Sequence, residues 1–380
     1  MIQRHVLTYC SNIHPGESWE DVLRNLNDHA LAVKAELSPA TIFPLGLRLS
    51  ARAASEITVD SMHRFRDWLG DHGCRVATVN GFPYGVFHGT TVKHAVYEPD
   101  WRHAERARYT MQLADILAQW LAPNQIGSIS TVPIAFRERF LDEHWTPVRA
   151  NLLDTLAHLA LIRDRGGPLI QLALEPEPHC VLETIPEVIR FFSRMQFPSA
   201  FTEHIGICLD CCHQAVEFER PDRVLAQLRE AGITIAKVQV SSALRAVGNE
   251  IASLLQFNEP TYLHQAVALT SRGTLARFCD LPDLARWLAR GERAEEVRVH
   301  FHVPVFLDHL GSVGTTRFFL DEILPQLDPC IPLEVETYSF GVLPASLRFR
   351  SIGDSIVREL RWVTQRLNDA RLDDAPHRRH

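Results

Sequence analysis

Short apolar runs alternate along the chain with segments in which apolar residues recur every three or four positions. The runs are typical of buried strands, and the periodic segments are typical of helices that turn one apolar face to a core. One such face is formed by Val148, Leu152, Leu156 and Leu159. The eight predicted strands lie at 6–9, 45–49, 76–79, 126–129, 169–174, 205–209, 233–240 and 332–335. The pattern therefore predicts eight strand–helix units in series.

Eight strand–helix units close most economically into a (β/α)8 barrel, the TIM barrel, whose active site lies at the carboxyl ends of the strands. The alternative is a doubly wound open sheet, which usually carries a glycine-rich phosphate-binding turn after its first strand. Residues 10–16, Cys-Ser-Asn-Ile-His-Pro-Gly, lack such a turn. We therefore expect an α/β fold with a single TIM-barrel domain over 1–367 and a flexible tail over 368–380.

The interval between the seventh and eighth predicted strands is much longer than one helix requires. Within it, 297–305 alternates like an extra strand or hairpin. We expect an excursion over about 242–330 that lies over the barrel mouth and carries Tyr262, His264, His300 and His302. Long insertions at this face of a barrel usually serve function.

Oxygen-bearing side chains end four consecutive predicted strands. Because side chains alternate between the two faces of a strand, the leucines before these positions face the outer helices and the polar side chains face the barrel axis. The four are Glu175, Asp210, Gln239 and Glu336. A single strand-end glutamate is more often a solvated loop residue or half of an ion pair, but carboxylates that converge on one axis repel unless a cation lies among them. The set of four therefore predicts a divalent metal site.

The residue types narrow the identity of the metal. Hard oxygen donors with one or two imidazoles suit Mn, Mg, Co, Fe or Zn. His213 lies three residues after Asp210, a spacing that lets it bind a second metal or orient the first. His300 and His302 share one face of their predicted strand and are candidates for contact with a substrate. We therefore expect a divalent-metal cofactor held mainly by oxygen atoms.

Composition limits the class of protein. The chain has 380 residues, 46% of them hydrophobic, and no uncharged stretch approaches the roughly 18 residues of a membrane span. Its first residues show no basic leader followed by an apolar stretch, and its eight cysteines are too sparse for a disulfide scaffold, so we expect a cytoplasmic protein. A net charge of -7 argues against nucleic acid as a partner. Cys208, Cys211 and Cys212 allow a redox or zinc interpretation, but without a second cysteine pair nearby they are better explained by packing.

The strand ends resemble those of a known superfamily. Glu175, Asp210-x-x-His213, Gln239 and Glu336 look like the xylose isomerase-like barrels, which include sugar epimerases and the endonuclease IV type of nuclease. The whole chain resembles more closely the EboE family, described as metabolite traffic proteins and encoded in bacterial ebo gene clusters. The matching stretches are T-Y-C-S-N-I-H-P-G-E-S-W at 8–19, G-L-R-L-S-A-R-A at 46–53, N-G-F-P-Y-G-V-F-H-G at 80–89, S-I-S-T-V-P at 128–133, L-E-P-E-P at 174–178, H-F-H-V-P at 300–304 and E-V-E-T-Y at 334–338.

The resemblance implies a metal-dependent isomerase or epimerase that acts on a small metabolite, with partners from the same gene cluster. Glu175 and Glu336 would remove and return a proton through an enediolate of the substrate. Arg48, at the end of the second predicted strand, is available for a carboxylate or phosphate group. The full set of expected substrate-binding residues is Arg48, Asn80, Tyr84, His88, His300 and His302.

Departures from the relatives keep other functions open. Sugar epimerases carry a histidine where this chain has Gln239, a neutral and weaker donor, which favours a noncatalytic metabolite-binding or carrier protein on the same barrel. A third hypothesis is phosphodiester hydrolysis by a two-metal site that uses His213 and His302. The nuclease relatives hold three metals with further histidines, and the negative charge of this chain predicts no DNA groove.

Overall fold

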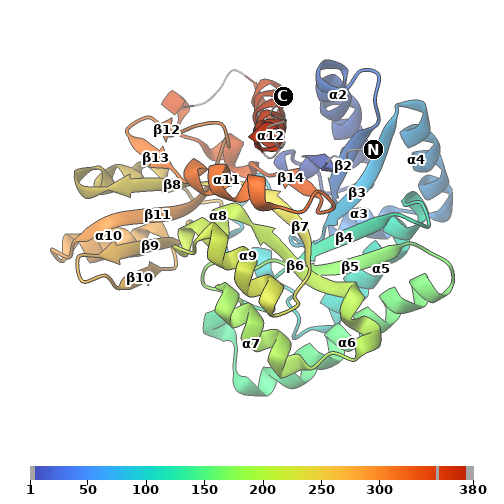
Figure 1. The fold of residues 1–380 in the computed structure, drawn as a ribbon, viewed down its shortest axis with the longest axis horizontal. Helices are drawn as coiled ribbons and strands as arrows, with labels where there is room; N and C mark the ends of the chain where they lie inside the picture. The colour runs from blue at the N-terminus through green and yellow to red at the C-terminus, as the bar shows by residue number, and fades with distance from the viewer. Residues whose placement is uncertain (1–4, 348–350, 374–380) are drawn as a thin grey trace, which may run out of the picture.

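Eight parallel strands close into a barrel in the computed structural model, which describes residues 5–347 and 351–373 (Figure 1). Around the barrel their order is β1-β14-β7-β6-β5-β4-β3-β2. The strands are β1 (Leu7–Cys10), β2 (Phe43–Arg48), β3 (Cys74–Asn80), β4 (Ile126–Thr131), β5 (Leu169–Leu174), β6 (Ile205–Asp210), β7 (Ile235–Val240) and β14 (Leu333–Val335). The predicted (β/α)8 barrel is confirmed, and the open-sheet alternative is excluded because β1 pairs with both β14 and β2.

Helices surround the barrel because each buries one apolar face against the strands. On α6 this face is formed by Val148, Leu152, Leu156 and Leu159, all fully buried. The helices that follow the barrel strands are α1 (Trp19–Asn25), α2 (Leu31–Leu37), α3 (Ala51–Glu56), α4 (Val59–Asp71), α5 (Ala104–Trp120), α6 (Trp145–Asp164), α7 (Ile185–Met195), α8 (Cys211–Val216), α9 (Pro221–Glu230), α11 (Arg317–Ile323) and α12 (Ile352–Asp373). Within the described ranges, none of the helices combines the length and apolarity needed to cross a membrane.

The last helix changes the predicted boundary of the tail. An apolar face that includes Leu360, Val363 and Leu367 is buried, and α12 continues past it to Asp373. The tail expected at 368–380 therefore begins inside this helix, and 374–380 lie outside the described residues.

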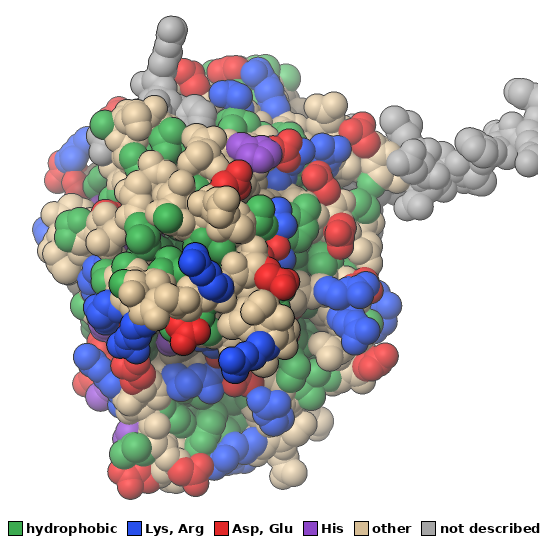
Figure 2. Space-filling model, turned by 90° about the vertical axis from the view of Figure 1, so that its left-hand side faces the viewer, with side chains coloured by type: hydrophobic (Ala, Val, Ile, Leu, Met, Phe, Trp, Pro, Cys, Tyr) green, Lys and Arg blue, Asp and Glu red, His purple; other side chains and the backbone are tan. Residues whose placement is uncertain are grey.

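The excursion between β7 and β14 forms a second sheet. Its six strands are antiparallel and ordered β10-β9-β11-β8-β13-β12, with α10 (Leu281–Ala289) beside them. They are β8 (Ser242–Val247), β9 (Ala266–Thr270), β10 (Leu275–Phe278), β11 (Ala294–Val303), β12 (His309–Leu310) and β13 (Val313–Thr315). Figure 1 shows this sheet extending to one side of the barrel. Figure 2, which views that side, shows basic and acidic side chains interspersed over the face.

A buried ion pair fills the barrel axis below the strand ends. The ammonium of Lys237 on β7 lies 2.7 Å from Oε1 of Glu334 on β14, and the Thr8 hydroxyl donates to Oε2 of the same carboxylate at 3.0 Å. Burial disfavours the charge of Lys237, but Glu334 and other anionic neighbours raise its pKa above the ordinary value of a lysine. Gly46 on β2 makes room for this arrangement, because a Cβ atom there would lie 1.3 Å from Oε2 of Glu334.

We predict that Gly46→Ala destabilises the protein by about 3 kcal/mol, because the added methyl group must displace a carboxylate held in a buried ion pair. Chemical denaturation measures the change, with the same dependence of the unfolding free energy on denaturant concentration fitted to the wild type and the variant. Gly70→Ala is the control, since a Cβ atom at Gly70 of α4 would contact nothing within 4 Å. Equal stability of the two variants would contradict this account of the barrel axis.

Candidate metal centre and active site

Three carboxylates meet at the carboxyl ends of the barrel strands. Glu175 follows β5, Asp210 is the last residue of β6, and Glu336 follows β14. Each offers an oxygen atom that lies within 4.8 Å of those of the other two, and all three side chains are buried. The structure thus brings together three of the four oxygen ligands expected from the sequence.

Gln239, the fourth expected ligand, lies on β7, between the strands that carry Asp210 and Glu336. It is fully buried on β7, where it pairs in register with Asp210 on one side and with Glu334 on the other. Neither atom of its amide has a hydrogen-bond partner. Buried amides are almost always paired, so the unpaired amide of Gln239 is consistent with a site that a bound group completes.

The carboxylates repel one another. Burial, and then the neighbouring Glu336 and Asp210, raise the pKa of Glu175 well above its ordinary value. Burial, and then Asp210, raise the pKa of Glu336 to about 8, although Lys237 acts in the opposite direction. Glu175 and Glu336 therefore favour their neutral forms in this site unless a cation lies among the acids.

Other atoms of the cluster also lack partners. Oε2 of Glu175, Oδ2 of Asp210 and Nε2 of His302 are buried without a hydrogen bond. Unpaired buried polar atoms cost about 1–3 kcal/mol each, so they mark a site that a bound group completes. Carboxylate and amide oxygens with an imidazole are a donor set for a divalent metal ion. The residues present therefore fit the expected cofactor.

Neighbouring polar groups orient the carboxylates. Oδ1 of Asp210 accepts hydrogen bonds from the main-chain N–H of His213 at 2.9 Å and from the Ser241 hydroxyl at 2.8 Å, which leaves Oδ2 free. Oε1 of Glu336 accepts from the amides of Asn12 at 2.8 Å and Asn80 at 3.1 Å. Asn80, expected to bind substrate, thus also positions an acid. Asn12 was not singled out from the sequence, although it lies in the matched stretch 8–19.

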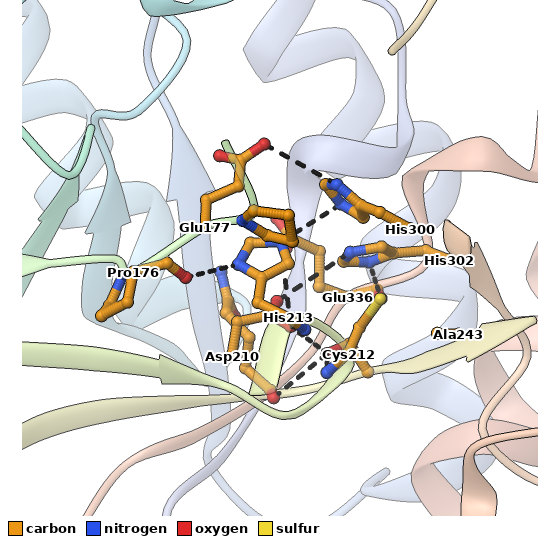
Figure 3. A network of polar contacts seen from close by, with 12 residues as sticks. Pro176, Glu177, Asp210, Cys212, His213, Ala243, His300, His302 and Glu336 are labelled. Atoms are coloured by element: carbon orange, nitrogen blue, oxygen red, sulfur yellow. Dashed lines mark hydrogen bonds and ion pairs between the residues drawn. The ribbon is translucent and has the colours of Figure 1, made fainter. Parts of the chain in front are cut away.

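Three histidines gather beside the carboxylates (Figure 3). His213 belongs to α8, directly after β6, while His300 and His302 come from β11 of the excursion. Nε2 of His213 lies 3.1 Å from Nε2 of His300 and 3.9 Å from Oδ1 of Asp210. Nε2 of His302 lies 3.9 Å from Oδ2 of Asp210. The inserted sheet therefore contributes to the same centre as the barrel.

A further acid, Glu177, was missed by the sequence analysis. Its Oε1 accepts a hydrogen bond from the Tyr97 hydroxyl at 2.6 Å and lies 3.7 Å from Nδ1 of His300. Burial raises the pKa of this glutamic acid. The available signal was its position two residues after Glu175 in the stretch L-E-P-E-P.

A cavity opens onto these groups. Its floor is polar and its walls are largely aromatic and aliphatic. The lining residues are Asn12, Asn80, Phe82, Pro83, Phe87, Val92, Lys93, Val96, Tyr97, Glu175, Glu177, His213, Tyr262, Leu263, His300, Glu336 and Tyr338. Of the six expected substrate-binding residues, Asn80 and His300 line the cavity, and His302 lies in the metal-ligand group of Asp210 and His213.

Arg48 does not line the cavity, which corrects its expected role. Its guanidinium makes a two-pronged ion pair with Glu17, with both distances 3.0 Å, and donates to the carbonyl oxygens of Gly16 and Gly85. These contacts use the guanidinium to hold two loops together.

Tyr84 and His88 do not line the cavity either. The Tyr84 ring packs edge-on against Tyr109, with ring centroids 5.0 Å apart. His88 bonds through its ring nitrogens to the Asn12 carbonyl at 2.7 Å and the Tyr262 hydroxyl at 2.8 Å. His88 thus supports two lining residues, Asn12 and Tyr262, whereas Tyr109, the partner of Tyr84, does not line the cavity.

Comparison with known proteins identifies the fold. No protein-family model matches the chain, and no curated protein matches it by sequence. Among solved structures, a xylose isomerase domain protein from Planctomyces limnophilus is similar with a TM-score of 0.54 at 14% identity, over 99% of each chain. A xylose isomerase-like TIM barrel protein from Mycobacterium smegmatis in complex with magnesium has a TM-score of 0.54 at 11% identity, over 96% of this chain and 97% of that one. D-allulose 3-epimerase from Methylomonas sp. in complex with D-allulose has a TM-score of 0.53 at 14% identity, over 96% and 98%. The chain therefore has the xylose isomerase-like barrel fold.

We predict that Mn2+ raises the melting temperature of the chelator-treated protein, because an ion that binds only the folded state stabilises it by about 2.7 kcal/mol at 100 times its dissociation constant. Asp210→Asn should abolish this shift, since the variant removes the one charge that touches both the other carboxylates and the histidines. Asp60→Asn on α4, an exposed position, is the control. An undiminished shift in Asp210→Asn would refute the metal centre.

Proposed function

We propose that the protein is a metal-dependent isomerase or epimerase that acts on a small, uncharged sugar or polyol-type metabolite. The observation that carries the proposal is the pair of acids Glu175 and Glu336. Both line the cavity, and both belong to the candidate metal-ligand group that Asp210 completes. The similarity in fold to a D-allulose 3-epimerase supports it.

Glu175, Asp210, Gln239 and Glu336 would hold the ion. A divalent metal bound there would polarise adjacent hydroxyl and carbonyl oxygens of a substrate and so acidify the hydrogen on the carbon between or beside them. The remaining chemistry belongs to the side chains of the chain itself.

The two glutamates are placed to move a proton. On one side of the barrel, β7 and β6 separate β14 from β5, so Glu336 and Glu175 approach the cavity from different directions. Asn12 and Asn80 fix the Glu336 carboxylate by its Oε1 atom, and Glu175 has an unpaired oxygen. One acid would take the proton and leave an enediolate, and the other would return it on the opposite face of the carbon.

The cavity wall indicates the class of substrate. Phe87, Tyr262 and Tyr338 form an aromatic cluster with ring centroids 5.1 to 5.2 Å apart, against which the apolar face of a sugar ring or carbon chain can pack. Among the described residues that line the cavity, Lys93 is the one lysine or arginine, and its ammonium lies 2.6 Å from Oδ2 of Asp280. With Arg48 also occupied, the wall favours an uncharged substrate over a sugar phosphate.

Finer assignments stay predictions from the sequence. Membership of the EboE family, metabolite traffic with gene-cluster partners, and a cytoplasmic location follow from the motifs and composition described above. A noncatalytic carrier is the second candidate function, and the neutral Gln239 at an expected metal ligand favours it. In that case the cavity would bind a metabolite without exchanging its hydrogen atoms.

We predict that the Mn2+-loaded protein exchanges a carbon-bound hydrogen of its substrate with solvent deuterium, measured by NMR over a panel of ketopentoses and ketohexoses. Glu175→Gln and Glu336→Gln should each slow exchange by at least about 100-fold, the usual contribution of a general acid or base. The exposed Asp60→Asn variant should retain full activity.

The exchange experiment also separates the two candidates. Saturable sugar binding without exchange in the wild-type protein would replace the isomerase with a carrier. Exchange that persists in both glutamate variants would reject the two-acid scheme.

A further inference from the structure

The cavity is smaller than the metabolite it would hold. It encloses about 60 Å3, whereas small-molecule sites usually enclose about 300–1,000 Å3. A pentose or hexose therefore fits only if part of the wall moves. The long loop between β3 and α5 supplies much of that wall, through the lining residues Phe82, Pro83, Phe87, Val92, Lys93, Val96 and Tyr97.

Arg106 of α5 fixes the two ends of this loop. Its guanidinium is fully buried and donates through Nη1 to the carbonyl oxygens of Gly81 at 2.7 Å and Phe82 at 3.1 Å, where the loop begins. Through Nε it donates to the carbonyl oxygen of Pro99 at 2.7 Å, where the loop returns to the barrel. Movement of the loop is therefore confined to the residues between these ends.

Further anchors lie on both sides of the middle of the loop. Before it, the N–H of Phe87 donates to Oε1 of Glu17 at 3.1 Å, and after it the Tyr97 hydroxyl donates to Oε1 of Glu177 at 2.6 Å. Between these anchors lie residues 89–96, which we call the flap. All but one of its residues are exposed or half-buried, so a movement of the flap breaks little packing.

The excursion holds the flap against the cavity. The main-chain N–H groups of Val92 and Lys93 both donate to the carbonyl oxygen of Thr261, at 2.8 and 2.9 Å. The Lys93 ammonium lies 2.6 Å from Oδ2 of Asp280 and donates to the carbonyl oxygen of Glu259 at 3.1 Å. Within the described ranges, this is the one ion pair that the flap makes. Both of its side chains are partly exposed, so water can replace either partner.

The two sides of this contact differ in rigidity. Lys93 has a φ of +39°, in the left-handed region, and a residue with a β-carbon stays there only while its surroundings impose it. Asp280 is fixed from its own side, because its Oδ1 accepts from the N–H groups of Leu281 at 2.9 Å and His264 at 3.1 Å and so caps α10. The flap is therefore the side that moves.

We propose that the flap opens to admit the substrate and closes over it, and that the ion pair between Lys93 and Asp280 is its latch. The flap supplies Val92 and Val96, as well as Lys93, to the cavity wall, so its departure exposes the aromatic cluster to an entering sugar. The excursion thus serves entry to the cavity as well as the metal centre. The proposal rests on the cavity being the substrate site of the proposed function, but not on the reaction performed there.

A thiol placed in the cavity tests the flap in the full-length protein. Leu263→Cys puts a cysteine at a buried lining position, which N-ethylmaleimide reaches when the cavity opens. Adding Lys93→Met or Asp280→Asn should speed labelling at position 263 by at least about 5-fold, the change in open population expected from loss of one charge-assisted hydrogen bond. Arg64→Met, which removes an exposed ion pair with Asp60 on α4, should leave the rate unchanged.

The native Cys208 is the internal control. It is fully buried on β6, so it is labelled only when the barrel unfolds, and mass spectrometry reads both thiols in one sample. Faster labelling at position 263 without a change at Cys208 supports the flap. Equal rates at position 263 with and without the latch substitutions would overturn it, and so would a parallel rise at Cys208.

Two further points keep the result interpretable. If the Lys93→Met variant does not fold, as judged by circular dichroism, Asp280→Asn decides alone, because it removes the same ion pair from the other side. Failure of the isomerase proposal would appear as absent hydrogen exchange in the sugar panel, with the difference in labelling intact.

Discussion

The mutual repulsion of buried carboxylates is the constraint on which the centre depends. The barrel register fixes Glu175, Asp210 and Glu336 at neighbouring strand ends, so the acids cannot separate without disrupting the apolar packing of the strands. One layer below, the same difficulty is solved within the chain, because Lys237 neutralises Glu334 at 2.7 Å. Among the described residues, no lysine or arginine forms an ion pair with any of the three upper acids. The repulsion is therefore relieved either by protonation of Glu175 and Glu336 or by a cation from solution.

The inserted sheet is the second element of the centre. Because β8 starts directly after β7, the excursion leaves the barrel at the very end where the acids lie, and β11 returns to place His300 and His302 there. The Glu336 carbonyl, which follows the last barrel strand, accepts from His302. The carboxylate group of Glu175, Asp210 and Glu336 is thus linked to the histidines through the backbone as well as through Asp210.

The sequence predicts the barrel well because buried strands are continuous apolar runs, and all eight predicted runs coincide with barrel strands. The sequence also predicts which acids meet, because the alternation of side chains between the two faces of a strand continues to the residue directly after it. It fails where partners are distant: nothing local to Arg48 reveals that Glu17, thirty-one positions earlier, takes up its guanidinium. Asn12 lies in the single 3-10 turn Ser11–Ile13 and Glu177 in a loop, neither of which has periodicity, and most strands of the inserted sheet are too short to stand out.

The charges of the residues that line the cavity help to distinguish the three candidate functions. Phosphodiester hydrolysis needs cationic groups beside the metals to hold the phosphate, and the lining described here offers Lys93, already paired with Asp280. A carrier would use Glu336 only as a metal ligand, whereas here this acid also lines the cavity, with its Oε1 held by the amides of Asn12 and Asn80. Proton transfer would fit both features: the one lysine of the described lining is paired and so leaves the carboxylates available as bases, and a metal ion among them would polarise the substrate oxygens.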